Sequence, residues 1–135
     1  MSDATGSGEH NMVDTYLACM AAHDWEGLAA TVADEGLVRD GPFCDAIEGK
    51  GPYVEFLEGI ITSLEDYELK VSRVAHVSDH VSYVELSETF LVDGVSTEYP
   101  ECLVFGRDRD GFVDYVSVFM KYPGAQAPVE GGSAA

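Results

Sequence analysis

Three oxygen-bearing side chains lie where the sequence pattern predicts an apolar wall. Glu88 and Glu101 alternate with apolar residues on one face of expected strands, and Tyr16 lies within the apolar stripe of an expected helix. Burying an ionised carboxyl costs several kcal/mol, so burial favours the neutral acid, which donates a hydrogen bond. A neutral carboxyl beside a tyrosine hydroxyl could bind an oxygen that becomes negative during a reaction. These residues therefore indicate an oxyanion site.

A fourth group, Asp40, ends a short strand expected over residues 37–40, and there it would remain ionised and act as a general base. Each residue also has an alternative reading. Asp40 could bond its own backbone in a turn, and Tyr16 could bond a backbone carbonyl in the core. Glu88 could be a solvated acid near a strand end, and Pro100 could turn Glu101 to solvent.

The elements that would position these groups begin with three helices. The first is expected from residue 13, the second has Asp24 as its N-cap and ends before Gly36, and the third starts at Pro52. The apolar stripe of the first helix is Val13, Tyr16, Leu17 and Met20, and that of the third is Tyr53, Phe56, Leu57, Ile60, Ile61 and Leu64.

From residue 67 the period of the apolar residues changes to two, which predicts four antiparallel strands over 67–71, 81–92, a segment ending at 105, and 112–120. Asp93-Gly94 marks a hairpin between the second and third. The order predicts an α+β fold: a cone of three N-terminal helices packed on a curved, mainly antiparallel sheet. The apolar pocket of this cone is expected to be lined by Met20, Phe56, Leu86, Glu88, Tyr99, Leu103, Val116, Val118 and Met120.

The chain of 135 residues is expected to form one domain over residues 11–123, with disordered tails at 1–10 and 124–135. It carries 25 acidic residues against 7 basic ones, a net charge of −18, which disfavours nucleic acid and anionic lipid as partners. No apolar run is long enough to span a membrane. Three cysteines without a CxxC motif favour a reducing cytoplasm.

The order of these residues resembles the ketosteroid isomerase branch of the NTF2-like superfamily, which also includes SnoaL-like cyclases and limonene-epoxide hydrolases. The resemblance covers about residues 12–121 and rests on Tyr16, His23-Asp24, Ala33-Asp34, Val38-Arg39-Asp40, Ile47-Glu48-Gly49-Lys50, Phe56, and Glu101 four residues before Phe105. It implies that Tyr16 and a protonated Glu101 hold an enolate oxygen while Asp40 moves a proton next to a carbonyl group.

The resemblance leaves other functions open. An epoxide hydrolase or a SnoaL-like polyketide cyclase could use the same acids, although Glu85, Ser87 and Val118 occupy the places of the hydrolase's water-activating set. A non-catalytic small-molecule-binding protein would keep the pocket without turnover. The expected ligand in each case is an apolar small molecule with a carbonyl or an epoxide.

We expect no cofactor and no metal: His76 and His80 flank a hairpin and share no helical face. The outward face of the last strand carries Val113, Tyr115 and Phe119, which predicts a homodimer formed through the sheet.

Overall fold

The computed structural model describes residues 11–124. The tails predicted at 1–10 and 124–135 therefore lie outside the described residues, apart from Gly124. No helix among the described residues is long and apolar enough to cross a membrane.

The helices begin where the sequence provides caps. The Asn11 side chain accepts a hydrogen bond from the Val13 amide at 2.9 Å and opens α2 (Met12–Ala22). Asp24 accepts one from the Gly27 amide at 2.9 Å and opens α3 (Trp25–Ala29). A third helix, α4 (Lys50–Thr62), follows Gly49, whose φ of 100° places it in a conformation that favours glycine.

The described strands form one six-stranded sheet in the order β2-β1-β6-β5-β4-β3. Their bounds are β1 Val38–Asp40, β2 Ala46–Glu48, β3 Glu68–His76, β4 Val81–Val92, β5 Val95–Arg107 and β6 Val113–Met120. The β1–β6 pair is parallel and the other pairs are antiparallel. The mainly antiparallel sheet was predicted, whereas β2 was not.

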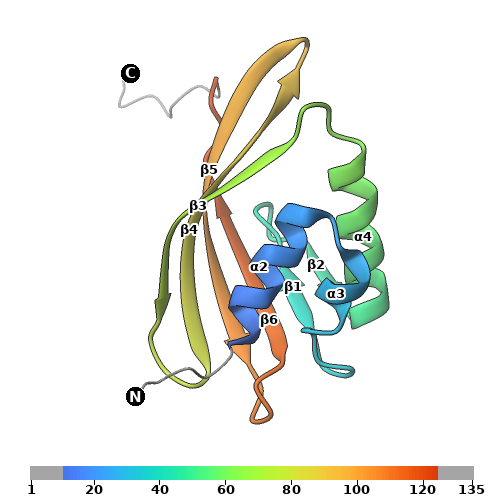
Figure 1. Ribbon diagram of the computed structural model, residues 1–135, viewed down its shortest axis with the longest axis vertical. Helices are drawn as coiled ribbons and strands as arrows, with labels where there is room; N and C mark the ends of the chain where they lie inside the picture. The colour runs from blue at the N-terminus through green and yellow to red at the C-terminus, as the bar shows by residue number, and fades with distance from the viewer. Residues whose placement is uncertain (1–10, 125–135) are drawn as a thin grey trace.

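The predicted set of three N-terminal helices is matched only in part. The described residues contain three helices, but α3 has only five residues, and β2 lies between the predicted strand β1 and α4. Figure 1 shows all three on one side of a curved sheet, with α2 crossing its middle and α4 lying farther out. The α+β class and the layering are therefore as expected, while the order of elements is more interleaved.

A β-bulge near the start of β6 changes which residues face the helices. Gly106 pairs with Tyr115, but Arg107 pairs with Val113, so the register shifts by one residue between them. Val113 is consequently fully buried in the core, and Tyr115 is exposed on the other face. The expectation that Val113 lies on the outward face is wrong for this reason.

The helices bury their apolar stripes against the inner face of the sheet. The Tyr16 ring meets Phe105 edge-on, with ring centroids 4.9 Å apart. The core cluster comprises Val13, Tyr16, Leu17, Met20, Leu28, Val32, Leu37, Tyr53, Leu57, Ile61, Val84, Leu86, Leu103, Phe105, Val113 and Val116. Burial of this surface is the main favourable contribution to folding.

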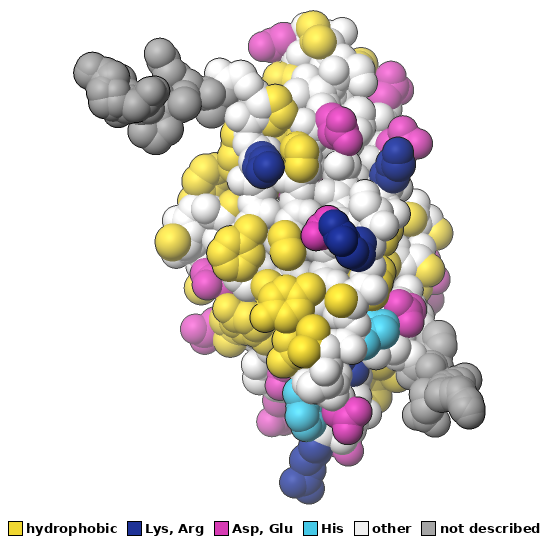
Figure 2. All heavy atoms as spheres, turned by 90° about the vertical axis from the view of Figure 1, so that its left-hand side faces the viewer, with side chains coloured by type: hydrophobic (Ala, Val, Ile, Leu, Met, Phe, Trp, Pro, Cys, Tyr) yellow, Lys and Arg dark blue, Asp and Glu magenta, His cyan; other side chains and the backbone are white. Residues whose placement is uncertain are grey.

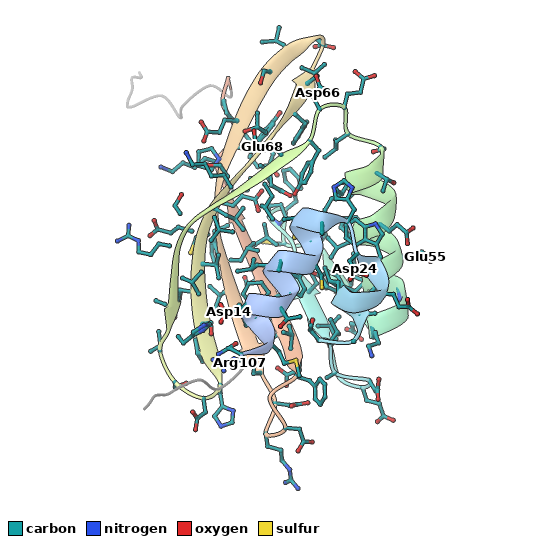
Figure 3. The ribbon with its side chains drawn as sticks, in the orientation of Figure 1. Asp14, Asp24, Glu55, Asp66, Glu68 and Arg107 are labelled. Carbon is teal, nitrogen blue, oxygen red and sulfur yellow. The ribbon has the colours of Figure 1, made fainter. Side chains whose placement is uncertain are left out.

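A polar network fixes the first turn of α2 to the sheet. Arg107 Nη2 donates to Ser82 Oγ at 2.8 Å, so the Ser82 hydroxyl is free to donate to His76 Nδ1, 2.7 Å away. The other imidazole nitrogen, Nε2, lies 3.3 Å from Asp14 Oδ2. Figure 3 shows Asp14 and Arg107 at the same end of the molecule. Because Asp14 lies half a turn before Tyr16, the network helps to hold Tyr16 in place.

Candidate functional site

A cavity of about 430 Å³ lies between the helices and the inner face of the sheet. This volume falls in the range of small-molecule sites. Of the residues predicted to line a pocket, the structure places Met20, Phe56, Glu88, Tyr99, Leu103, Val116, Val118 and Met120 on its wall. Leu86 is not on this wall; it is a buried core residue beside a hollow on the other face of the sheet.

The structure brings Tyr16 and Glu101 to the cavity but not Asp40. Within β1, Arg39 lines the cavity, so its neighbour Asp40 points to the opposite face. The register agrees: Asp40 pairs with Ser117 on β6, and Arg39 pairs with Val116, which is on the cavity wall. The structure therefore brings Tyr16 and Glu101 together on this cavity wall without Asp40.

Tyr16 is joined by a second tyrosine that the sequence pattern marked only as core. The hydroxyls of Tyr16 on α2 and Tyr53 on α4 hydrogen-bond to each other, and both side chains are buried. Two hydroxyls carry two protons and their mutual bond uses one; no acceptor for the other is found among the described residues. The second proton is thus available to a ligand oxygen.

Burial controls the pKa of both tyrosines. Desolvation raises the pKa of Tyr16 well above its ordinary value. Desolvation also raises the pKa of Tyr53 to about 12, although the hydrogen bond from Tyr16 and the charge of Arg39 oppose the shift. Both groups are therefore neutral donors at physiological pH.

Glu101 forms a carboxyl pair with Glu88. Leu86 of β4 lies opposite Glu101 and Tyr99 of β5 lies opposite Glu88, so the two acids are diagonal neighbours on the inner face. Burial, then the hydrogen bond and charge of Glu88, raise the pKa of Glu101 to about 10. Glu101 Oε2 is buried and has no hydrogen-bond partner among the described residues.

Glu88 is the accepting member of this pair. It receives a hydrogen bond from Tyr67 Oη to its Oε2 at 2.5 Å in addition to the contact with Glu101. Tyr67 lies just before β3, and burial raises its pKa, so it remains a donor. Glu88 thus has two neighbouring donors, Tyr67 and Glu101, for its carboxyl oxygens.

Arg39 and Asp45 complete the polar wall, and the sequence analysis did not select either. Arg39 Nη1 lies 3.3 Å from Asp45 Oδ2, and the Phe56 ring lies 4.7 Å from Arg39 Cζ. Alternation along 37–40 could have placed Arg39 on the same face as the buried Leu37. No pattern predicts Asp45, because it lies in the turn between β1 and β2.

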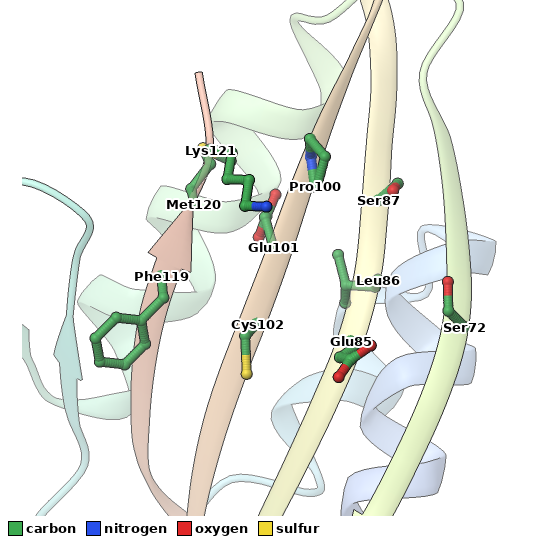
Figure 4. A pocket seen from close by; sticks show the side chains of 10 residues that line it. All are labelled: Ser72, Glu85, Leu86, Ser87, Pro100, Glu101, Cys102, Phe119, Met120 and Lys121. Carbon is green, nitrogen blue, oxygen red and sulfur yellow. The ribbon is translucent and has the colours of Figure 1, made fainter. Parts of the chain in front are cut away.

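A second hollow, of about 490 Å³, lies where β3, β4, β5 and the end of β6 run side by side (Figure 4). Its wall includes Glu85, Cys102, Phe119 and Lys121. Within residues 11–124, no group of three His, Cys, Asp or Glu side chains is arranged to hold a metal ion.

Comparisons with solved structures agree on the fold. A candidate ketosteroid isomerase from Kribbella flavida superposes with a TM-score of 0.71 at 20% identity, covering 90% of this chain and 84% of that chain. An epoxide hydrolase of the limonene-epoxide-hydrolase-like type from Mycobacterium tuberculosis gives a TM-score of 0.68 at 18% identity, covering 82% and 80%. At these identities the likeness establishes the fold alone.

A third structure is that of another M. tuberculosis protein in complex with estradiol-17beta-hemisuccinate. It gives a TM-score of 0.67 at 19% identity, covering 82% of this chain and 95% of that chain. A comparison with curated proteins finds no match. Residues 13–122 match the SnoaL-like domain family, which is most of the chain. The NTF2-like resemblance is thereby confirmed, and the chain belongs to the SnoaL-like family.

Proposed function

We propose that the protein is a cofactor-independent enzyme that shifts a proton next to the carbonyl group of an apolar small molecule. The observation that carries the proposal is the buried Glu101, whose pKa burial raises to about 10, on the wall of the same cavity as the Tyr16–Tyr53 hydroxyl pair. Neutral donors in a water-poor cavity stabilise an enolate oxygen better than a ground-state carbonyl. The neighbour in complex with estradiol-17beta-hemisuccinate supports small-molecule binding.

Because Asp40 faces away from the cavity, we assign the base to Glu88. Its carboxylate would take the proton from the carbon next to the carbonyl, and the electrons of that C–H bond would form the enolate. Once Glu88 holds this proton, Glu101 no longer donates to it and can direct its own proton toward the enolate oxygen. Glu88 would then return the proton to another carbon, which completes an isomerisation without any cofactor.

The proposal is tested by proton exchange in deuterated water. The probe is a series of β,γ-unsaturated cyclic ketones, starting with 3-cyclohexen-1-one, followed by ¹H NMR for exchange at the α-carbon and by absorbance for the conjugated product. Glu88→Gln should abolish both signals, while Asp40→Asn should keep them. Exchange that is lost in Asp40→Asn but not in Glu88→Gln would return the base to Asp40.

A second candidate, an epoxide hydrolase, is favoured by the Arg39–Asp45 pair in the cavity wall. Protonated Glu101 would donate to the epoxide oxygen while a carboxylate activates water. Incorporation of ¹⁸O from water into a diol, with limonene oxide as probe, would select this function. Binding of either probe without turnover would leave the non-catalytic binding protein.

We also propose that the protein forms a homodimer through the outer face of the sheet and acts in the cytoplasm. Figure 2 shows hydrophobic side chains gathered on this face, and the exposed Tyr83, Tyr115 and Phe119 belong to strands that form it. All three cysteines are free, as expected in a reducing compartment.

A further inference from the structure

Arg39 is a buried guanidinium whose hydrogen-bonding capacity is mostly unfilled. Its side chain is 10% exposed and lines the cavity. A guanidinium has five N–H donors, yet the hydrogen bond found for it among residues 11–124 is that from Nη1 to Asp45 Oδ2, at 3.3 Å. Phe56 covers one face of the group. The remaining donors are left for water or for a ligand in the cavity.

A purely structural arginine would be expected to have closer partners. A buried charge is tolerated when it is paired and hydrogen-bonded. Asp45 is a weak partner, because the contact is long and its side chain is 52% exposed. Arg39 is therefore positioned, but only partly neutralised. That is the state of a group prepared to accept a second anion.

The free proton of the tyrosine pair lies within the influence of Arg39. Burial raises the pKa of Tyr53, and the charge of Arg39 lowers it more than Glu88 raises it. At Tyr16, in contrast, the effect of Glu88 exceeds that of Arg39. Tyr53 lines the same cavity as Arg39, and the charge of the guanidinium partly offsets the cost of negative charge beside Tyr53.

We propose that Arg39 binds a negatively charged oxygen of the ligand together with the Tyr53 hydroxyl, so that the cavity takes cyclic apolar compounds in their anionic form. The inference rests on the proposed function in one respect: the enolate that forms in the proposed isomerisation carries such a negatively charged oxygen. Phe56 packs against the guanidinium, and the half-exposed Asp45 pairs with it. Asp45 then competes with the ligand anion for Arg39.

The competition gives the proposal an unusual signature: the two members of the ion pair should have opposite effects on anion binding. Arg39→Gln removes the positive charge. Asp45→Asn removes the competing negative charge, while the asparagine oxygen can still accept from the Phe43 amide, which now bonds Asp45 Oδ1 at 3.2 Å. If the pair served only structure, both variants would weaken binding of every ligand alike.

The test uses 4-nitrophenol, whose phenol and phenolate forms absorb at different wavelengths, so that the bound form is read directly. The uncharged 4-nitroanisole is the matched control ligand, and 4-nitrobenzoate is the carboxylate arm. Dissociation constants are measured for the wild-type protein and both variants by titration calorimetry, and circular dichroism checks that each variant is folded. Because the net charge of −18 weakens binding of any anion, variants are compared at one ionic strength.

Arg39→Gln should raise the dissociation constant of 4-nitrophenolate about 10- to 100-fold, the loss of a charged hydrogen bond, and leave that of 4-nitroanisole within about twofold. Asp45→Asn should tighten phenolate binding a few-fold. If Arg39→Gln weakens the binding of 4-nitrobenzoate alone, the natural anion is a carboxylate. If it weakens the binding of 4-nitrophenolate alone, the natural anion is an enolate. Either result supports the role of Arg39.

Equal losses for charged and neutral ligands, weaker phenolate binding in Asp45→Asn, or binding of 4-nitrophenol only as the neutral phenol would overturn the proposal. Because these measurements require no turnover, they remain decisive even if the ketones show no proton exchange.

Discussion

Replacing Glu101 with glutamine should make the protein more stable at neutral pH, and increasingly so as the pH rises. The carboxyl of Glu101 is 8% exposed and its pKa is raised from 4.5 to about 10, first by burial and then by Glu88. An unfolded chain releases this proton near the ordinary value, whereas the folded chain keeps it. The unfolded state therefore binds fewer protons between the two values, and the free energy of unfolding falls as the pH rises.

One proton corresponds to about 1.4 kcal/mol per pH unit. Glutamine has no proton to release and its amide can still donate to Glu88, so this dependence is removed in Glu101→Gln. The stability difference between variant and wild type should consequently grow by about 3 kcal/mol between about pH 5.5 and 7.5. The value is an upper limit, since a change in the ionisation of Glu88 in the variant would reduce it.

The measurement is urea unfolding followed by circular dichroism at three pH values in that interval, with equal m-values as a check on two-state behaviour. The control is Glu98→Gln, because Glu98 is exposed on the same strand. Its stability difference from wild type should not change with pH. A difference for Glu101→Gln that is also constant with pH would refute the protonated state of Glu101, and with it the donor role in the proposed reaction.

Three further predictions test the site and the assembly. Glu88→Gln should lower the rate of α-proton exchange at least about 100-fold, as for a lost general base, whereas Asp40→Asn should change it less than about threefold, both measured by NMR in deuterated water. Tyr53→Phe removes the proton offered to the ligand and should lower kcat about 10- to 1,000-fold with little change in KM, which steady-state kinetics would reveal. Phe119 is 61% exposed on the outer sheet face, and Phe119→Asp places a charge there. The variant should be a monomer where the wild type is a dimer, as measured by light scattering after size-exclusion chromatography. An unchanged mass would exclude this face as the interface.

The sequence predicted well what depends on long, regular patterns. The stripes through Tyr16 on α2 and Tyr53 on α4 fixed which faces of these helices are buried. The hairpin at Asp93-Gly94 forms as expected, with φ of 51° and 78°, and aligns β4 with β5. Because both strands are long, their alternation correctly placed Glu88 and Glu101 on the inner face.

Short or irregular elements were not predictable in the same way. β1 has three residues, so its alternation does not itself reveal which face is inner. The inner face is decided by the pairing of β1 with β6, about eighty residues later. A shift of this pairing by one residue would place Asp40 instead of Arg39 on the inner face. The bulge that turned Val113 inward has no clear sequence signal either. The Tyr16–Tyr53 bond depends on how two helices cross, which their separate stripes do not specify.

The parallel pairing of β1 with β6 also constrains how this protein can form in the cell. The wall that carries Arg39 is completed only when Val116 and its neighbours in β6 have been synthesised and docked. A chain still emerging from the ribosome can fold α2 and the β4–β5 hairpin locally, but it leaves the hollow open on one side. Ligand capture should therefore await synthesis of β6, and truncation ahead of β6 would abolish it.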